Sequence, residues 1–140
     1  MSNVNAFASA GVMGVSGDTQ AAYLDRPFSY VYDVTLTALQ TLLNQSVPIM
    51  TDSDFILRGI YVSFATGLFE MRFSDASSYY FSNGLINVQN FSFFAGQPWP
   101  VVPEVWYPAG GKIGIDIADT SGNSNTVEIV FVGVKRFPVC

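Results

Sequence analysis

Apolar and polar residues alternate along much of this chain. From Phe28 to Leu36 every second residue is aromatic or aliphatic, and the residues between them include Ser29, Asp33 and Thr35. A period of two is typical of a β-strand with one face buried and one face exposed. No window of eleven or more residues has the period of an amphipathic helix. The pattern therefore predicts an all-β fold.

Several later segments also have the character of strands. Segment 45–49 contains Pro48, which lacks a backbone N–H donor and is best tolerated in an edge strand. Residues 55–64 are apolar at almost every position, as expected for a strand covered on both faces. We predict three hairpins, which join 55–64 to 69–73 through residues 65–67, 79–82 to 85–88 through Asn83-Gly84, and 112–119 to 126–134 through a polar loop.

Residues 91–111 differ from the predicted strands. They contain both tryptophans and four prolines, namely Pro98, Pro100, Pro103 and Pro108. We predict that this segment crosses from one sheet to another with few ladder hydrogen bonds, because proline cannot donate one. About eight short strands without an internal repeat favour an antiparallel two-sheet sandwich or jelly roll. We assign residues 27–140 to this jelly-roll β-sandwich domain.

Residues 1–26 show neither period and are rich in Ala, Gly, Ser and Asn. They predict an extended N-terminal arm that cannot form a core of its own. Its apolar residues suit an arm docked on a neighbouring subunit, and a poorly ordered terminus is the alternative. The segment lacks the basic and continuous apolar regions of a signal peptide, and no run in the chain is long enough for a membrane-spanning helix. We expect neither a leader nor a membrane partner.

The composition favours contact with other proteins. The 140 residues fit one domain, and only 12% are charged whereas 49% are hydrophobic. Soluble domains average about 25% charged residues. Much of the surface must therefore consist of apolar atoms and uncharged polar groups. The net charge of −5 and the scattered cations argue against binding to nucleic acid.

The chain lacks histidine and has a single cysteine, Cys140. These counts exclude Ser-His-Asp and Cys-His nucleophile systems and histidine- or thiolate-based metal centres. A single cysteine cannot form an internal disulfide, which is compatible with folding in a reducing cytosol. We expect no catalytic residues, no cofactor and no metal.

Carboxylates are the remaining candidates for chemistry. Asp52 and Asp54 are close enough in sequence to share a calcium ion, but no further ligands follow in register, so we favour a turn. Asp116 and Asp119 could act as an acid–base pair of the kind that glycosidases use. Asp116 alternates outward with Lys112, and an exposed ion pair explains it better. A carboxylate enzyme is thus a minor alternative.

Aromatic residues are abundant, with 12 Phe, 7 Tyr and 2 Trp. Trp99, Trp106 and Tyr107 are candidate platforms for stacking on sugars, as in a carbohydrate-binding jelly-roll module. Packing in the core and at subunit interfaces is the favoured interpretation. The candidate protein-interface residues are Val4, Phe7, Val12 and Met13 in the arm, and Phe94, Trp99, Val101, Trp106 and Tyr107 in the crossing segment.

Three segments carry a resemblance to a known family. They are Thr51–Ile60 (TDSDFILRGI), 103–116 (PEVWYPAGGKIGID) and 127–137 (VEIVFVGVKRF). The chain from about residue 28 to 137 resembles the small jelly-roll cement, or decoration, proteins of tailed bacteriophages. The resemblance implies a structural virion protein without catalysis, made in the host bacterial cytoplasm and bound to the capsid exterior. Its implied partners are the major capsid protein and a second copy of itself, with a dimer favoured over a trimer. A tail or baseplate module is the alternative.

Overall fold

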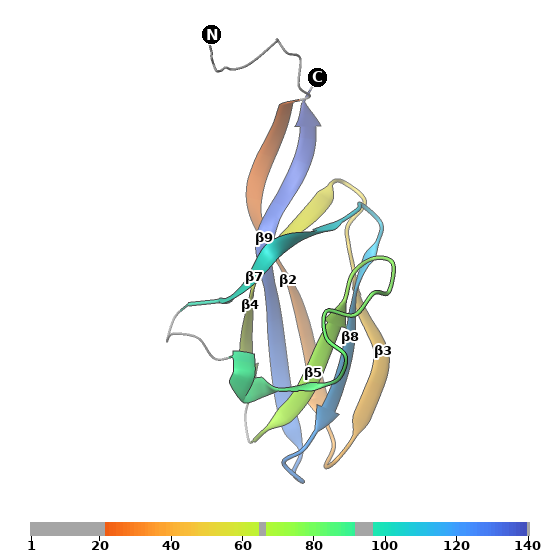
Figure 1. The fold of residues 1–140 in the computed structure, drawn as a ribbon, viewed down its shortest axis with the longest axis vertical. Helices are drawn as coiled ribbons and strands as arrows, with labels where there is room; N and C mark the ends of the chain where they lie inside the picture. The colour runs from red at the N-terminus through yellow and green to blue at the C-terminus, as the bar shows by residue number, and fades with distance from the viewer. Residues whose placement is uncertain (1–21, 65–66, 92–96, 140) are drawn as a thin grey trace.

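The computed structural model describes residues 22–64, 67–91 and 97–139, which form eight β-strands and one short 3-10 helix (Figure 1). In chain order these elements are β2 (Ala22–Leu36), β3 (Thr41–Pro48), β4 (Asp54–Phe64), β5 (Phe69–Ser74), β6 (Ile86–Asn87), η1 (Val88–Phe91), β7 (Trp99–Tyr107), β8 (Lys112–Asp119) and β9 (Asn125–Val139). No helix in these ranges is long and apolar enough to cross a membrane.

The strands form two antiparallel four-stranded sheets that pack face to face. Their orders are β2-β9-β4-β7 and β3-β8-β5-β6. Every strand except β6 lies in the sheet opposite to that of the preceding strand, and the first and last strands are neighbours. This is the strand order of a jelly roll. The predicted all-β antiparallel sandwich is confirmed, with β3 as the expected edge strand and β4 as the expected central one.

None of the three predicted hairpins forms. Strands β4 and β5 exist near the predicted positions, as do β8 and β9, but the members of each pair lie in different sheets. The segment 79–88, predicted as a hairpin through Asn83-Gly84, contains only the short β6 and an isolated bridge between Ser74 and Tyr80. Gly84 does not adopt a left-handed conformation. A turn-forming sequence predicts that the chain reverses direction, but it does not specify which sheet the next strand joins. Here the reversals bring apolar faces together across the core.

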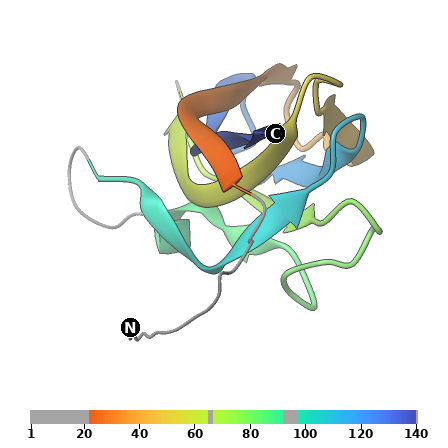
Figure 2. The same ribbon diagram turned by 90° about the horizontal axis from the view of Figure 1, so that it is seen from above.

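The predicted crossing segment 91–111 is also wrong in part, because it contains β7. This strand pairs with β4 at the edge of its sheet and lies at the periphery of the molecule (Figure 2). Leu57 pairs with Val105 but Gly59 pairs with Pro100, so residues 101–104 bulge out of the ladder. Proline is tolerated here because an edge strand and a bulge leave backbone N–H positions without ladder partners.

The boundary between arm and domain also changes. Strand β2 begins at Ala22 and pairs with β9 along 15 positions, so residues 22–26 belong to the sheet and not to the arm. The β2–β9 ribbon extends beyond the rest of the sandwich (Figure 1). Residues 22–26 are exposed on both faces, which explains why their sequence lacks a period of two. Residues 1–21, which include the candidates Val4, Phe7, Val12 and Met13, lie outside the described residues, as does Phe94.

The core lies between the sheets and is largely aromatic. Tyr30 packs edge-on against Phe55 with ring centroids 4.8 Å apart, and Phe73 packs in the same way against Phe131 at 5.3 Å. Edge-to-face contacts of this kind are favourable beyond their buried area. The predicted alternation from Phe28 to Leu36 is confirmed, since every second residue of this segment, starting at Phe28, lies in or against this core.

Candidate protein-interaction site

The bulge in β7 creates an apolar hollow at the edge of its sheet. The hollow has a volume of about 480 Å³, a size that accepts a large side chain or several smaller ones. All of its lining residues are apolar: Phe81, Trp99, Pro100, Val101, Val102, Pro103 and Val105. This arrangement offers a partner shape and apolar surface rather than hydrogen bonds.

Several residues that line the hollow are packed against the core. Trp99 packs against Phe91 with ring centroids 4.9 Å apart, and Val101 and Val105 rest partly buried against the core. Val102 is 86% exposed in the bulge, and Phe81 is also exposed. Apolar side chains gathered around a hollow in this way typify a surface that another molecule covers.

The sequence predicted part of this site. Trp99 and Val101 line the hollow as candidate interface residues, but Phe81, Val102, Pro103 and Val105 were not singled out. The sequence feature that could have predicted the bulge is the Val-Val pair between Pro100 and Pro103. Two prolines this close in a strand favour an edge position, because neither can donate a backbone hydrogen bond to a neighbouring strand. Phe81 comes from the segment between β5 and β6, and no local pattern relates it to β7.

Tyr107 is a correction, because it is completely buried and cannot contact a partner. Its hydroxyl donates a hydrogen bond to the backbone carbonyl of Ser74 at 2.8 Å. Burial raises the pKa of this hydroxyl. Tyr107 faces the core because side chains alternate along a strand, so it points to the face opposite that of Trp106. The hydroxyl of a buried tyrosine usually has a hydrogen-bond partner, which here is the Ser74 carbonyl.

Trp106 is 45% exposed but lies outside both the hollow and the core. Its indole N–H donates to Asp54 Oδ2 at 2.9 Å, and the Arg136 guanidinium lies 5.1 Å from the centre of its ring. Trp99, by contrast, packs on the core side of the sheet. The three aromatic residues proposed as a sugar-stacking platform therefore do not share one surface.

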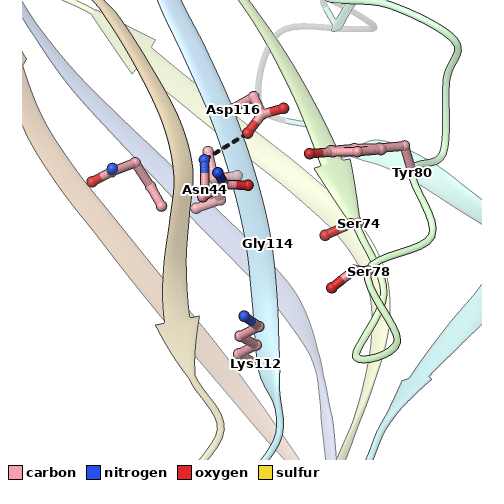
Figure 3. A pocket seen from close by; sticks show the side chains of 9 residues that line it. Asn44, Ser74, Ser78, Tyr80, Lys112, Gly114 and Asp116 are labelled. Atoms are coloured by element: carbon pink, nitrogen blue, oxygen red, sulfur yellow. Dashed lines mark hydrogen bonds between the residues drawn. The ribbon is translucent and has the colours of Figure 1, made fainter.

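A second, polar hollow lies on the other sheet (Figure 3). Its volume is about 40 Å³, enough for a few water molecules and too small for a sugar. The side chains that line it come from β3, β5, β8 and the segment after β5, and they include Asn44, Ser74, Ser78, Tyr80, Lys112 and Asp116.

Asp116 is the second correction, since its side chain was expected in an exposed ion pair and it is only 1% exposed. It shares the outward face of β8 with Lys112, but β3 and the segment carrying Tyr80 cover it (Figure 3). Burial alone raises the pKa of a carboxyl group. The N–H of Asn44, the Arg72 guanidinium and the Tyr80 hydroxyl outweigh burial and hold the pKa of Asp116 below its usual value.

The other acidic residues also have structural partners. Asp119 accepts hydrogen bonds from the backbone N–H groups of Leu39 and Gly122 and from the Ser121 hydroxyl. These bonds lower the pKa of Asp119 and fasten two chain reversals at the end of β8. Each carboxylate of the acid–base pair considered above is thus hydrogen-bonded by its own set of donors.

The turn predicted around Asp52 and Asp54 is confirmed. Lys135 Nζ lies 2.9 Å from Asp52 Oδ2, and its hydrogen bond lowers the pKa of Asp52. Asp54 accepts from Trp106 and from the N–H of Ala109. Across residues 22–64, 67–91 and 97–139, no three potential ligands among His, Cys, Asp and Glu cluster closely enough to hold a metal ion.

The protein was compared with family models, curated proteins and solved structures, and none of them matches.

Proposed function

We propose that this protein is a non-enzymatic structural subunit of a bacteriophage virion, which cements the capsid from outside by joining neighbouring copies of the major capsid protein. It acts as a homodimer. The main support is the apolar hollow on the β7 edge, which Trp99 and Val101 help to line and where Val102 is 86% exposed. Jelly rolls are recurrent in viral capsid proteins, and the sequence resembles cement proteins of this fold.

An apolar hollow suits binding to a protein. Interface energy is concentrated where apolar side chains fill desolvated pockets, and polar groups around them contribute less. A capsid also repeats each contact many times. Weak individual contacts then combine into stable attachment, because a subunit held at one site is at high local concentration near the next.

The alternatives have less support. Catalysis by a carboxylate pair is disfavoured because Asp116 and Asp119 each have a full set of structural partners. Binding of a sugar by stacked aromatics is disfavoured because Tyr107 is buried and Trp106 lies outside the hollow that Trp99 lines.

The proposal is tested by sedimentation with particles of the encoding phage that were assembled without this protein. Val102→Asp places a carboxylate at the rim of the hollow and is expected to weaken binding at least about tenfold, with an unchanged melting temperature. Leu43→Asp is the matched control, because Leu43 is also an exposed apolar residue but lies on β3 of the opposite sheet. We expect this control to bind as wild type.

Two results contradict the proposal. One is wild-type binding by Val102→Asp, and the other is failure of the wild-type protein to bind the particles. Binding of the wild-type protein to immobilised glycans, lost in folded Trp106→Ala, would favour the carbohydrate-binding alternative.

A further inference from the structure

The outer face of the β2-β9-β4-β7 sheet is apolar along most of its length. The strand register places Val31, Val130 and Tyr61 in one outward-facing row across three strands. The next rows contain Val132, and then Val134 beside the exposed Trp106 and the fully buried Ile56. None of these residues belongs to the core between the sheets.

This face differs from an ordinary solvated sheet. Antiparallel sheets with one wet face alternate apolar residues inward and polar residues outward. On β9 the alternation is lost, because Val130, Val132 and Val134 point outward while Ile129 and Phe131 point inward. The opposite sheet keeps the alternation, since Lys112 and Asp116 on β8 and Arg72 on β5 face outward. The unusual pattern is thus confined to one of the two outer faces.

Charged residues mark both ends of the apolar face, and the exposed Arg58–Glu104 ion pair interrupts it on the β4–β7 side. At one end Asp33 lies directly opposite Glu128. At the other end Arg136 forms a bidentate ion pair with Asp25, at 2.7 and 2.8 Å. The face between them extends from Pro27 to Asp33 along β2, a length of about 20 Å at the usual rise per residue. A segment that covers it must be apolar and at least seven residues long when extended.

We infer that this face is covered by the N-terminal segment of the same chain, residues 1–21. The segment contains one charged side chain, Asp18, and its apolar residues include Phe7, Met13 and Val15. It joins the sheet at Ala22, the first residue of β2, which is itself the edge strand of this sheet. The segment is therefore tethered next to the face that it matches in character.

The length of the segment allows it to fold back. Ser16, Gly17 and Asp18 are turn-forming residues a few positions before β2. Residues 4–15 span about 37 Å when extended, which exceeds the length of the face. Tethering also gives the segment a higher local concentration than any second copy has in dilute solution.

The inference is tested by disulfide formation within the free protein, in a Cys140→Ser background. Met13→Cys combined with Val132→Cys is expected to form a disulfide within one chain, with a yield that does not change with protein concentration. Met13→Cys combined with Leu43→Cys is the control, since Leu43 lies on the opposite sheet. We expect little disulfide in the control.

A second measurement avoids substitutions in the sheet. Deletion of residues 1–20 is expected to shift the methyl NMR signals of Val130, Val132 and Val134 and to raise the fluorescence of a bound apolar dye several-fold. The methyl signals of the core residue Ile115 serve as the internal reference. Melting temperatures establish that each variant is folded.

Three outcomes overturn the inference. They are equal disulfide yields in the test and control variants, a yield that rises with concentration and so reports a second copy, and unchanged valine signals after the deletion. All of these measurements use the free protein, so they remain readable even where binding to capsids fails. The two proposals are thereby separated.

Discussion

Asp116 and Arg72 face each other directly across the β8–β5 ladder, with 2.8 Å between the carboxylate Oδ2 and the guanidinium Nε. The same guanidinium lies 3.7 Å from the centre of the Tyr80 ring, and Asp116 also accepts the N–H of Asn44. One buried carboxylate therefore fastens β3, β5 and the segment after β5 to the middle of the sheet. Its role is to hold the sheet surface together.

Replacement of Asp116 is expected to be strongly destabilising. Asp116→Ala leaves the Arg72 charge and the Asn44 N–H without their partner, and loss of one member of a buried ion pair costs about 3 kcal/mol. Lys112→Ala is the control on the same strand and face, where the lysine is exposed, and we expect a change below about 0.5 kcal/mol. Urea denaturation measures both. Equal stabilities of the two variants would show that the ion pair is unimportant.

The same contact predicts acid sensitivity. The pKa of Asp116 is lower in the folded state than in the unfolded state, so its stabilisation is present at neutral pH and is lost as the pH falls below about 4. The stability difference between wild type and Asp116→Ala should therefore shrink in acid. A difference that is constant from pH 7 to pH 3 would contradict a charge-based role.

Gly133 is expected to tolerate no side chain. It lies where β9 passes the bulge of β4, and a Cβ built there would overlap the backbone carbonyl of Ile56. The backbone has to move, and we expect Gly133→Ala to lower the free energy of unfolding by about 2 kcal/mol. Gly84 is the matched control, because a Cβ at that position has no neighbour within 4 Å. Thermal or urea unfolding measures the stability of both variants. Equal destabilisation by the two substitutions would show that the close contact between residue 133 and the Ile56 carbonyl is not the cause.

The strands could be predicted because burial leaves a period in the sequence. Phe28 to Leu36 showed it clearly, whereas residues 22–26 did not because both of their faces are exposed. Sheet membership could not be predicted, since a turn between β4 and β5 has the same local chemistry whether the strands pair or pack across the core. The orientation of Tyr107 depends on the pairing of β7 with β4, and burial of Asp116 depends on Tyr80, which is distant in sequence. Both are products of tertiary contacts.

Leu39 adopts a left-handed backbone conformation with φ of 58° and is 69% exposed. This conformation is unfavourable for leucine, whereas asparagine tolerates it better. We expect Leu39→Asn to raise the free energy of unfolding by about 0.5–1 kcal/mol, because asparagine pays less for the left-handed conformation. The substitution keeps the hydrogen bond from the backbone N–H of residue 39 to Asp119. Ala38→Asn, at the preceding residue without positive φ, is the control and should give no gain. A gain in both variants would point to a general effect of polarity in this turn.

Glu128 lies directly opposite Asp33 at the end of the apolar sheet face, and both are exposed. A hydrogen bond with Asp33 and its negative charge raise the pKa of Glu128. Because the folded state holds this proton more tightly than the unfolded state, the associated stability is present at low pH and is lost as the pH rises through the folded-state pKa. Like charges at directly opposed positions are destabilising once both are ionised.

Glu128→Gln should therefore raise the melting temperature at pH 7, and the gain should disappear near pH 4, where the wild-type side chain is largely protonated. The control is Glu70→Gln on β5, whose register partners are the uncharged residues Asn87 and Ala118. Melting curves of the three proteins from pH 4 to pH 8 provide the comparison. A gain that persists in acid would mean that glutamine stabilises the ribbon through packing or hydrogen bonding, and relief of repulsion between Asp33 and Glu128 would then not be its cause.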